Sequence, residues 1–206
     1  MANETYPTLL YAHSGDDPNI RYLTHFEAPD PFWILKDKRK NYLVVNVLEY
    51  GRAIAAKKSN IVFTPEDLKL KGPSGYSHSV QIIALLKKLG IKTVSVPWTF
   101  PVAIVRDIEK KKINVHVLDQ EPCPQRQRKT PTEIDFLKEA QSAAVKGMKC
   151  AIKTLREAHT GRGGQLRLGT KVLSSERVRR IVEKELLDIG YNACTPIIAC
   201  GDQATD

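Results

Sequence analysis

Five histidines and two aspartates are the side chains of this chain best suited to bind a metal ion or move a proton. The histidines are spread over the whole length, at His13, His25, His78, His116 and His159. No two of them lie three or four residues apart, the spacing that places two ligands on one face of a helix. Asp202 and Asp206 lie closer together, but both fall in a predicted loop, where we expect exposed carboxylates. The sequence therefore predicts no metal-binding residue.

The cysteines and serines offer no nucleophile in a recognisable setting. The four cysteines are Cys123, Cys150, Cys194 and Cys200. No two of them have the separation typical of a zinc site, and no Gly-x-Ser-x-Gly segment is present. We expect reduced thiols, most of them packed against other side chains. The sequence thus predicts no catalytic residue and no cofactor-binding residue.

The net charge of +9 arises from 32 basic and 23 acidic residues. Residues 1–125 hold 17 basic and 13 acidic residues, and residues 126–206 hold 15 and 10, so the excess is spread over both parts. A surface that binds single-stranded nucleic acid combines such charge with aromatic side chains that stack on bases. The basic runs here contain no aromatic residue, and we expect no nucleic-acid partner.

Hydropathy gives no sign of a membrane protein. No apolar stretch approaches the roughly 18 residues that a membrane-spanning helix needs. Residues 1–5 lack the basic region and apolar run of a signal peptide. The sequence predicts a soluble, cytoplasmic protein with no membrane partner.

Residues 8–118 alternate between short apolar runs and amphipathic stretches. Strands are predicted at 8–12, 32–35, 42–45, 60–63, 91–96 and 115–118, and the alternation over 19–26 favours another. Helices are predicted at 49–58, from Pro73-Ser74 to Gly90, and at 101–111. The charged turn at 36–40 predicts a hairpin. Strand–helix–strand alternation of these lengths predicts an α/β architecture with a mixed sheet.

A polar segment with two prolines, residues 121–128, interrupts this alternation. We place a domain boundary there, which gives domains of residues 1–125 and 126–206. Thr130 then suits a helix N-cap, with Glu133 three residues later to complete a capping box. A helix is predicted from about 131 to 158.

One side of that predicted helix carries an apolar stripe with spacings of three and four residues. Its members are Ile134, Leu137, Gln141, Ala144, Met148, Ile152 and Leu155. Such stripes usually face a core, and we predict that this face does so.

The remaining residues predict a flexible loop at 159–164, a helix from Ser174 to Gly190 and a strand at 195–200. Apolar strands and helix stripes both need neighbours to cover them. We therefore expect residues 130–206 to be poorly packed alone.

Three segments resemble one family, in the same order along the chain. Asp17–Phe26 is similar to the Pro-Asn-Ile-Arg-Tyr-Leu-Thr-Gly-Phe segment of creatinase-type N-terminal domains. Lys129–Ile134, with Leu137 and Ala140, resembles the entry helix of the catalytic domain, and Thr195–Gly201 resembles the strand before a Pro-His loop. The family is that of creatinase, aminopeptidase P and prolidase, the pita-bread metallopeptidases.

The resemblance implies a creatinase-like N-terminal domain, with a mixed sheet flanked by helices, followed by an incomplete pita-bread α+β domain. It also implies hydrolysis at Xaa-Pro bonds in the complete protein, with proline-containing peptides as substrates and a homodimer as the assembly. In the family, two Asp, one His and two Glu hold two divalent metal ions, for which Mn²⁺, Co²⁺ and Zn²⁺ are the candidates. All five ligands would follow Asp206, so no site residue carries over and we expect this chain to be inactive.

Two other functions remain open from the sequence. One is a creatinase-like hydrolase that acts on a small amidino substrate, and the other is a non-catalytic dimerisation or binding module. The residues that would set peptidase against creatinase-like specificity would lie further along a complete chain.

Overall fold

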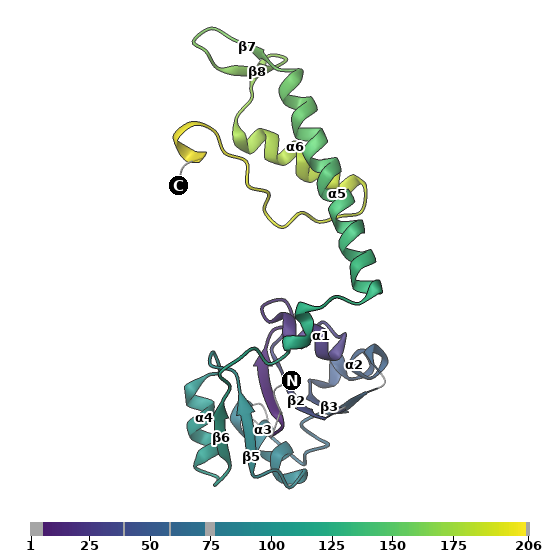
Figure 1. Ribbon diagram of the computed structural model, residues 1–206. Helices are drawn as coiled ribbons and strands as arrows, with labels where there is room; N and C mark the ends of the chain where they lie inside the picture. The colour runs from purple at the N-terminus through teal and green to yellow at the C-terminus, as the bar shows by residue number, and fades with distance from the viewer. Residues whose placement is uncertain (1–5, 39, 58, 73–76, 205–206) are drawn as a thin grey trace. The chain divides into compact units, whose positions relative to one another are not determined.

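The computed structural model describes residues 6–38, 40–57, 59–72 and 77–204, and the chain divides into two units (Figure 1). The first unit ends at Gln127 and the second begins at Arg128. This division lies two residues beyond the boundary placed after residue 125. Each unit has hydrophobic clusters of its own.

A six-stranded mixed sheet, ordered β4-β3-β2-β1-β5-β6, organises the first unit. The strands are β1 (Thr8–Ala12), β2 (Phe32–Asp37), β3 (Lys40–Val44), β4 (Asn60–Phe63), β5 (Thr93–Val96) and β6 (Asn114–Val117). Strand β2 runs antiparallel to β1 and β3, and the other neighbours are parallel. The predicted α/β class, the mixed sheet and the β2–β3 hairpin are confirmed.

Alternating side chains of the central strands supply two cores, one on each face of the sheet. Leu9 and Trp33 belong to one core, and Leu10 and Ile34 belong to the other. Successive side chains of a strand point to opposite faces. Because helices cover both faces, Leu9-Leu10 and Phe32–Leu35 are continuous apolar runs, and the polar residues of these two strands lie at their ends.

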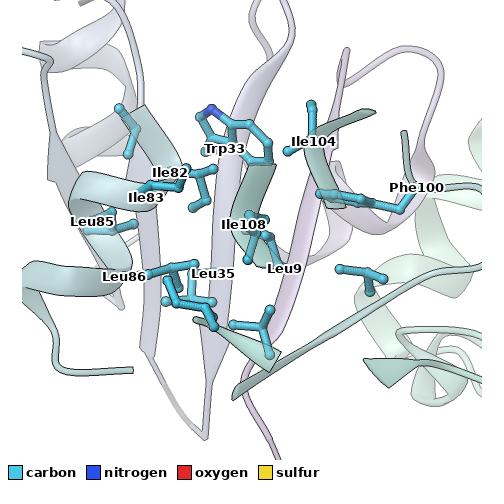
Figure 2. Close-up of a cluster of buried hydrophobic side chains, with 14 of the residues drawn as sticks. Leu9, Trp33, Leu35, Ile82, Ile83, Leu85, Leu86, Phe100, Ile104 and Ile108 are labelled. Atoms are coloured by element: carbon cyan, nitrogen blue, oxygen red, sulfur yellow. The ribbon is translucent and has the colours of Figure 1, made fainter. Parts of the chain in front are cut away.

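Two helices pack on each face. Helices α3 (His78–Lys88) and α4 (Val102–Glu109) contribute to the core drawn in Figure 2. Helices α1 (Pro18–Thr24) and α2 (Tyr50–Ala56) contribute to the opposite core, and a short 3₁₀ turn, η1 (Val47–Glu49), precedes α2. The helix start expected at Pro73-Ser74, and Lys58 at the expected end of α2, lie outside the described residues.

Helix α1 stands where the alternating pattern favoured a strand, so that prediction was wrong. Asp17 caps the helix, because its carboxylate accepts a hydrogen bond from the amide of Asn19 at 2.8 Å. Pro18 holds the first helical position, where its fixed φ suits a helix. Ile20 and Leu23 are buried at helical spacing. A short apolar run fits both the period of a helix and that of a strand, and here the Asp17 cap favours the helix.

The second unit contains two helices and a small antiparallel sheet. The helices are α5 (Pro131–Arg156) and α6 (Ser175–Asp188), and both were predicted. The sheet consists of β7 (His159–Thr160), β8 (Leu166–Leu168) and β9 (Lys171–Val172). The sequence predicts only a loop at 159–164, because strands of two or three residues are too short to show a period.

The capping box predicted at the start of α5 is present. Thr130 Oγ1 accepts a hydrogen bond from the amide of Glu133 at 3.2 Å, and the Glu133 carboxylate accepts one from the amide of Thr130 at 2.8 Å. These bonds satisfy two amides that the start of a helix leaves without partners.

Helix α5 packs on α6 through small residues. Ala143 and Gly147 are buried. Ala143 belongs to one cluster with Val178, Val182 and Leu186 of α6, and Gly147 lies against Val182 and Leu186. A Cβ atom on Gly147 would lie 3.3 Å from both Leu186 and Val182 side chains. The absence of a side chain at Gly147 therefore allows the two helices to approach closely.

The predicted core-facing stripe of α5 is largely exposed, so that prediction was wrong for this chain. The exposed fraction is 42% for Ile134, 55% for Leu137, 64% for Met148, 41% for Ile152 and 47% for Leu155. The periodicity identifies a face that can be buried, whereas α6 packs on the neighbouring face, where small residues allow a closer approach.

The strand predicted at 195–200 is also wrong, since these residues lack regular structure. Ile198 packs in the cluster between α5 and α6, whereas Ile197 is 94% exposed. The carbonyl of Pro196 accepts a hydrogen bond from Arg179 Nε at 3.1 Å. A strand needs a neighbouring strand, and within the described part of the second unit no strand pairs with this segment.

Candidate functional site

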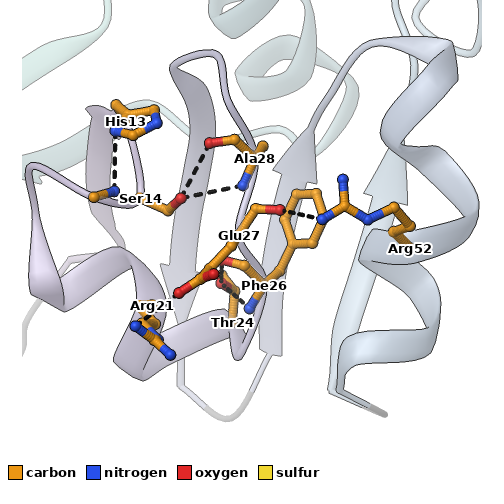
Figure 3. Close-up of polar contacts among 9 residues, drawn as sticks. His13, Ser14, Arg21, Thr24, Phe26, Glu27, Ala28 and Arg52 are labelled. Carbon is orange, nitrogen blue, oxygen red and sulfur yellow. Dashed lines mark hydrogen bonds and ion pairs between the residues drawn. The ribbon is translucent and has the colours of Figure 1, made fainter. Parts of the chain in front are cut away.

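A groove of about 440 Å³ lies in the first unit, at the end of β1 where the chain turns into α1. Three further segments complete it: the start of α1, the residues before β2, and one side chain of α2. The lining residues are His13, Ser14, Gly15, Pro18, Arg21, Glu27, Ala28, Pro29 and Arg52. Figure 3 shows most of these side chains and the polar contacts among them.

The loop after β1 folds back on His13. The carbonyl of His13 accepts hydrogen bonds from the amides of Asp16 and Asp17, both at 3.1 Å. The amide of Gly15 donates to His13 Nδ1 at 3.0 Å. A Cβ atom on Gly15 would lie 2.8 Å from the imidazole, so glycine permits this contact. Because Nδ1 accepts, the proton of a neutral ring is on Nε2.

Ser14 and Ala28 join the two loops that form the walls of the groove. Ser14 Oγ donates to the carbonyl of Ala28 at 3.2 Å and accepts from its amide at 3.1 Å. Both residues are buried. Because the backbone amide and the carbonyl of Ala28 both find their partner on one hydroxyl group, these bonds fix the separation of the two loops.

Two arginines face the groove from α1 and α2. Arg21 forms an ion pair with Glu27 at 2.7 Å. Arg52 donates to the carboxylate of Glu49 at 2.6 Å and to the carbonyl of Glu27 at 2.9 Å. Its guanidinium also lies 5.6 Å from the centre of the Phe26 ring. The position of Arg52 is thus fixed by three contacts.

This arrangement can bind a ligand, but it lacks the parts of a catalytic site. The lining holds two guanidinium groups, one carboxylate and one imidazole. Ser14 gives its hydroxyl proton to a backbone carbonyl, so it is not placed as an activated nucleophile. Such a set of donors suits recognition of an anionic group.

Two further polar side chains of the first unit have displaced pKa values. Burial and the nearby Asp30 carboxylate raise the pKa of Tyr11, whose hydroxyl lies 2.8 Å from His78 Nδ1. Burial lowers the pKa of Lys57, whose ammonium donates to the carbonyl of Leu23 at 2.8 Å. Neither group lies in the groove lining, and we assign neither a chemical role.

The structure does not bring the histidines together. His13 lines the groove, His25 ends α1, His78 contacts Tyr11, His116 stacks on Tyr6 with ring centroids 4.8 Å apart, and His159 lies in β7. Across residues 6–38, 40–57, 59–72 and 77–204, no group of three His, Cys, Asp or Glu side chains could hold a metal ion. Asp202 lies in the 3₁₀ turn η4 (Gly201–Ala204), and Asp206 lies outside the described residues. A pair of metal ions therefore does not fit the residues that the structure describes.

The cysteines are free thiols. Cys123 is buried, Cys150 is half-buried, and Cys194 and Cys200 are exposed. None of the described helices is long and apolar enough to cross a membrane.

Comparison with known proteins gives one family match. Residues 9–129 match the model of the Creatinase/Prolidase N-terminal domain. No curated protein matches the chain.

Several solved structures have a similar fold. The prolidase from Pyrococcus furiosus is 18% identical, with a TM-score of 0.61 over 89% of this chain and 45% of that one. The X-Pro aminopeptidase from Thermotoga maritima MSB8 is 15% identical, with a TM-score of 0.66 over 90% and 47%. The Xaa-Pro dipeptidase from Bacillus anthracis is 16% identical, with a TM-score of 0.64 over 89% and 44%. The chain thus spans less than half the length of these structures, and at such identities the likeness shows the fold alone.

Proposed function

The chain belongs to the creatinase/prolidase family through its N-terminal domain, and on that premise we propose that it forms the N-terminal portion of a metal-dependent Xaa-Pro aminopeptidase or dipeptidase. In this proposal the complete protein cleaves proline-containing peptides and assembles as a homodimer. The 206 residues themselves carry no peptidase activity.

The observation that carries the proposal is the family match over residues 9–129. The fold agrees with it, because solved Xaa-Pro peptidases match about nine-tenths of this chain. The proposed reaction is the one in the names of those proteins. Because this chain spans less than half of their length, we propose that further chain completes the enzyme.

The exposed face of α5 supports such a completion. Five large apolar side chains of the predicted stripe on this helix are more than two-fifths exposed. Contiguous apolar surface of this kind is uncommon on a finished monomer and marks a face that another element covers. Further chain packed on α5 would bury the stripe.

Metal ions would bind outside the described residues. Two divalent ions, Mn²⁺, Co²⁺ or Zn²⁺, are proposed for the complete protein, where they would activate a water molecule. Because the described residues provide no suitable ligand group, we derive no catalytic step from this chain.

The first test measures the mass of the protein isolated from its own source. A mass about twice that of the 206-residue chain is expected, since the chain spans 44–47% of the similar structures. A mass equal to that of the 206-residue chain would contradict the completion and favour a non-catalytic binding module.

The second test measures the release of the N-terminal residue from an Xaa-Pro peptide with Mn²⁺, Co²⁺ or Zn²⁺ present. We expect turnover by the protein from its source and none by the purified 206-residue chain. Chelator-sensitive turnover that scales with the amount of the 206-residue chain would contradict its inactivity. A longer source protein that leaves every Xaa-Pro peptide intact would contradict the peptidase assignment.

A further inference from the structure

The groove beside β1 holds two cationic donors, Arg21 and Arg52, that have no part in the proposed peptidase reaction. We propose that it is a binding site for a small organic carboxylate, such as the free carboxylate of an amino acid or short peptide. Arg21 and Arg52 are the groups that recognise the anion. The inference does not depend on the proposed peptidase, because the groove lies wholly in the first unit and binding needs no metal.

Arg52 is held in place before a ligand arrives. Its contacts with Glu49, the Glu27 carbonyl and the Phe26 ring fix the guanidinium plane. A guanidinium has five N–H donors, and the two hydrogen bonds of Arg52 to described residues engage only two of them. Donors therefore remain for a ligand, and little side-chain entropy is lost when they are used.

Arg21 faces the groove from the other side of Glu27 (Figure 3). Its pair with Glu27 is exposed, with 69% of the Arg21 side chain and 56% of the Glu27 side chain accessible. Exposed ion pairs contribute little stability, so a ligand carboxylate can share the Arg21 guanidinium at a small cost. The N–H on His13 Nε2 adds a further donor in the same lining.

The charge of the lining favours a carboxylate over phosphate. Both guanidinium groups already lie beside a carboxylate: Glu27 pairs with Arg21 at 2.7 Å, and Glu49, next to the lining, pairs with Arg52 at 2.6 Å. A ligand therefore meets guanidinium donors with little net positive charge around them. A phosphate dianion would add two negative charges beside Glu27 and Glu49, whereas a carboxylate adds one, so like-charge repulsion disfavours the dianion more.

The walls suit a small ligand with an apolar part. Pro18, Ala28 and Pro29 line the groove beside the charged groups. A volume of about 440 Å³ lies within the range of small-molecule sites, roughly 300–1,000 Å³. The Ser14–Ala28 bonds hold the loops that carry these walls.

The test follows the amide signal of Gly15 and the guanidinium Nε–H signals of the complete ¹⁵N-labelled 206-residue chain by NMR at pH 7 and low salt. N-acetylglycine is the carboxylate probe, N-acetylglycinamide is its uncharged match, and inorganic phosphate is the competing anion. We expect saturable shifts of these signals with N-acetylglycine, none with the amide, and weaker binding of phosphate. Equal shifts with the acid and the amide, or tighter binding of phosphate, would overturn the proposal.

Variants link the binding to the groove. Arg21→Gln is expected to weaken N-acetylglycine binding about tenfold, the loss expected for one charge-assisted contact. Arg21→Lys keeps the charge but not the fork, and an intermediate loss is expected. Arg106→Gln on α4, which packs on the opposite face of the sheet, makes the same charge change and should leave the affinity unchanged. Equal affinities of the parent chain and Arg21→Gln would also overturn the proposal.

Discussion

Ser14 and Ala28 are joined by two hydrogen bonds through a single hydroxyl group. The residues are fourteen apart in sequence, and each comes from a loop that flanks α1. Both are at least 94% buried. One small side chain therefore satisfies the backbone amide and the carbonyl of buried Ala28 and links the end of β1 to the start of β2.

Ser14→Ala should destabilise the first unit, because it removes the hydrogen-bond partner of the Ala28 amide and of the Ala28 carbonyl at once. Leaving a buried polar group without a hydrogen bond costs about 1–3 kcal/mol. The measurement is the free energy of unfolding in urea. Ser77→Ala is the matched control, since Ser77 is exposed and its side chain makes no capping bond to α3. Equal unfolding free energies for the two variants would mean that the link contributes nothing.

Gly147→Leu should separate α5 from α6. Even a Cβ at this position would lie 3.3 Å from Leu186 and Val182, and three more carbons have no space in the interface. Overpacking of this kind costs about 1–3 kcal/mol. Gly51→Ala on α2 is the control, because a Cβ there meets nothing within 4 Å. That change should stabilise the chain by up to about 1 kcal/mol through helix propensity. Thermal unfolding followed by circular dichroism measures both shifts.

The exposed stripe of α5 and its packed face should respond differently to substitution. Ile152→Lys should change the unfolding free energy by less than about 0.5 kcal/mol, as is usual for an exposed site. Leu186→Ala on α6 removes a buried side chain and should cost about 2–5 kcal/mol. Urea unfolding of the second unit compares the two variants. A loss of more than 2 kcal/mol in Ile152→Lys would mean that the stripe is covered in solution.

Asp107 should make stability depend on pH in the acid range. Its hydrogen bonds to Lys110 at 3.0 Å and to Ser79 at 2.8 Å lower the pKa of the carboxyl group in the folded chain. A lowered folded pKa means that the stabilising effect is complete above the unfolded value, about 3.9, and is lost as the pH falls through the folded value.

The check on Asp107 is urea unfolding from pH 7 to pH 3. The parent chain should be more stable than Asp107→Asn at pH 7, and the difference should shrink below about pH 4. Ser79→Ala removes one of the two bonds and should give a smaller difference of the same sign. A difference between parent and Asp107→Asn that stays constant over this range would contradict the assignment.

Local patterns predicted most of the elements of the first unit. The runs at 8–12 and 60–63 coincide with β1 and β4, and Thr130 with Glu133 gives the start of α5. These elements depend on neighbours a few residues away, which a sequence displays. At α1 the apolar alternation predicts a strand, whereas the Asp17 cap and Pro18 begin a helix there.

Contacts between residues far apart in the sequence could not be predicted in the same way. The stripe on α5 shows which side chains are apolar, but Gly147 and α6 decide which face is packed. The groove depends on partners at separations of 14 residues for Ser14 with Ala28 and 25 residues for Arg52 with Glu27. The motif Asp17–Phe26 marks part of the groove wall, but no spacing rule connects it to Arg52.

The polar segment before α5 packs on the first unit through Cys123 and Arg126. Cys123 is 2% exposed within the core between α1, α2 and the sheet, and Arg126 donates to Asn19 at 2.8 Å. A protease cut at residues 128–129 would release a fragment with that core intact, whereas a cut at 120–121 would leave a hole in it. In the same way, gene fusion or exchange could transfer the first unit as a module only if the transferred piece extended through Gln127.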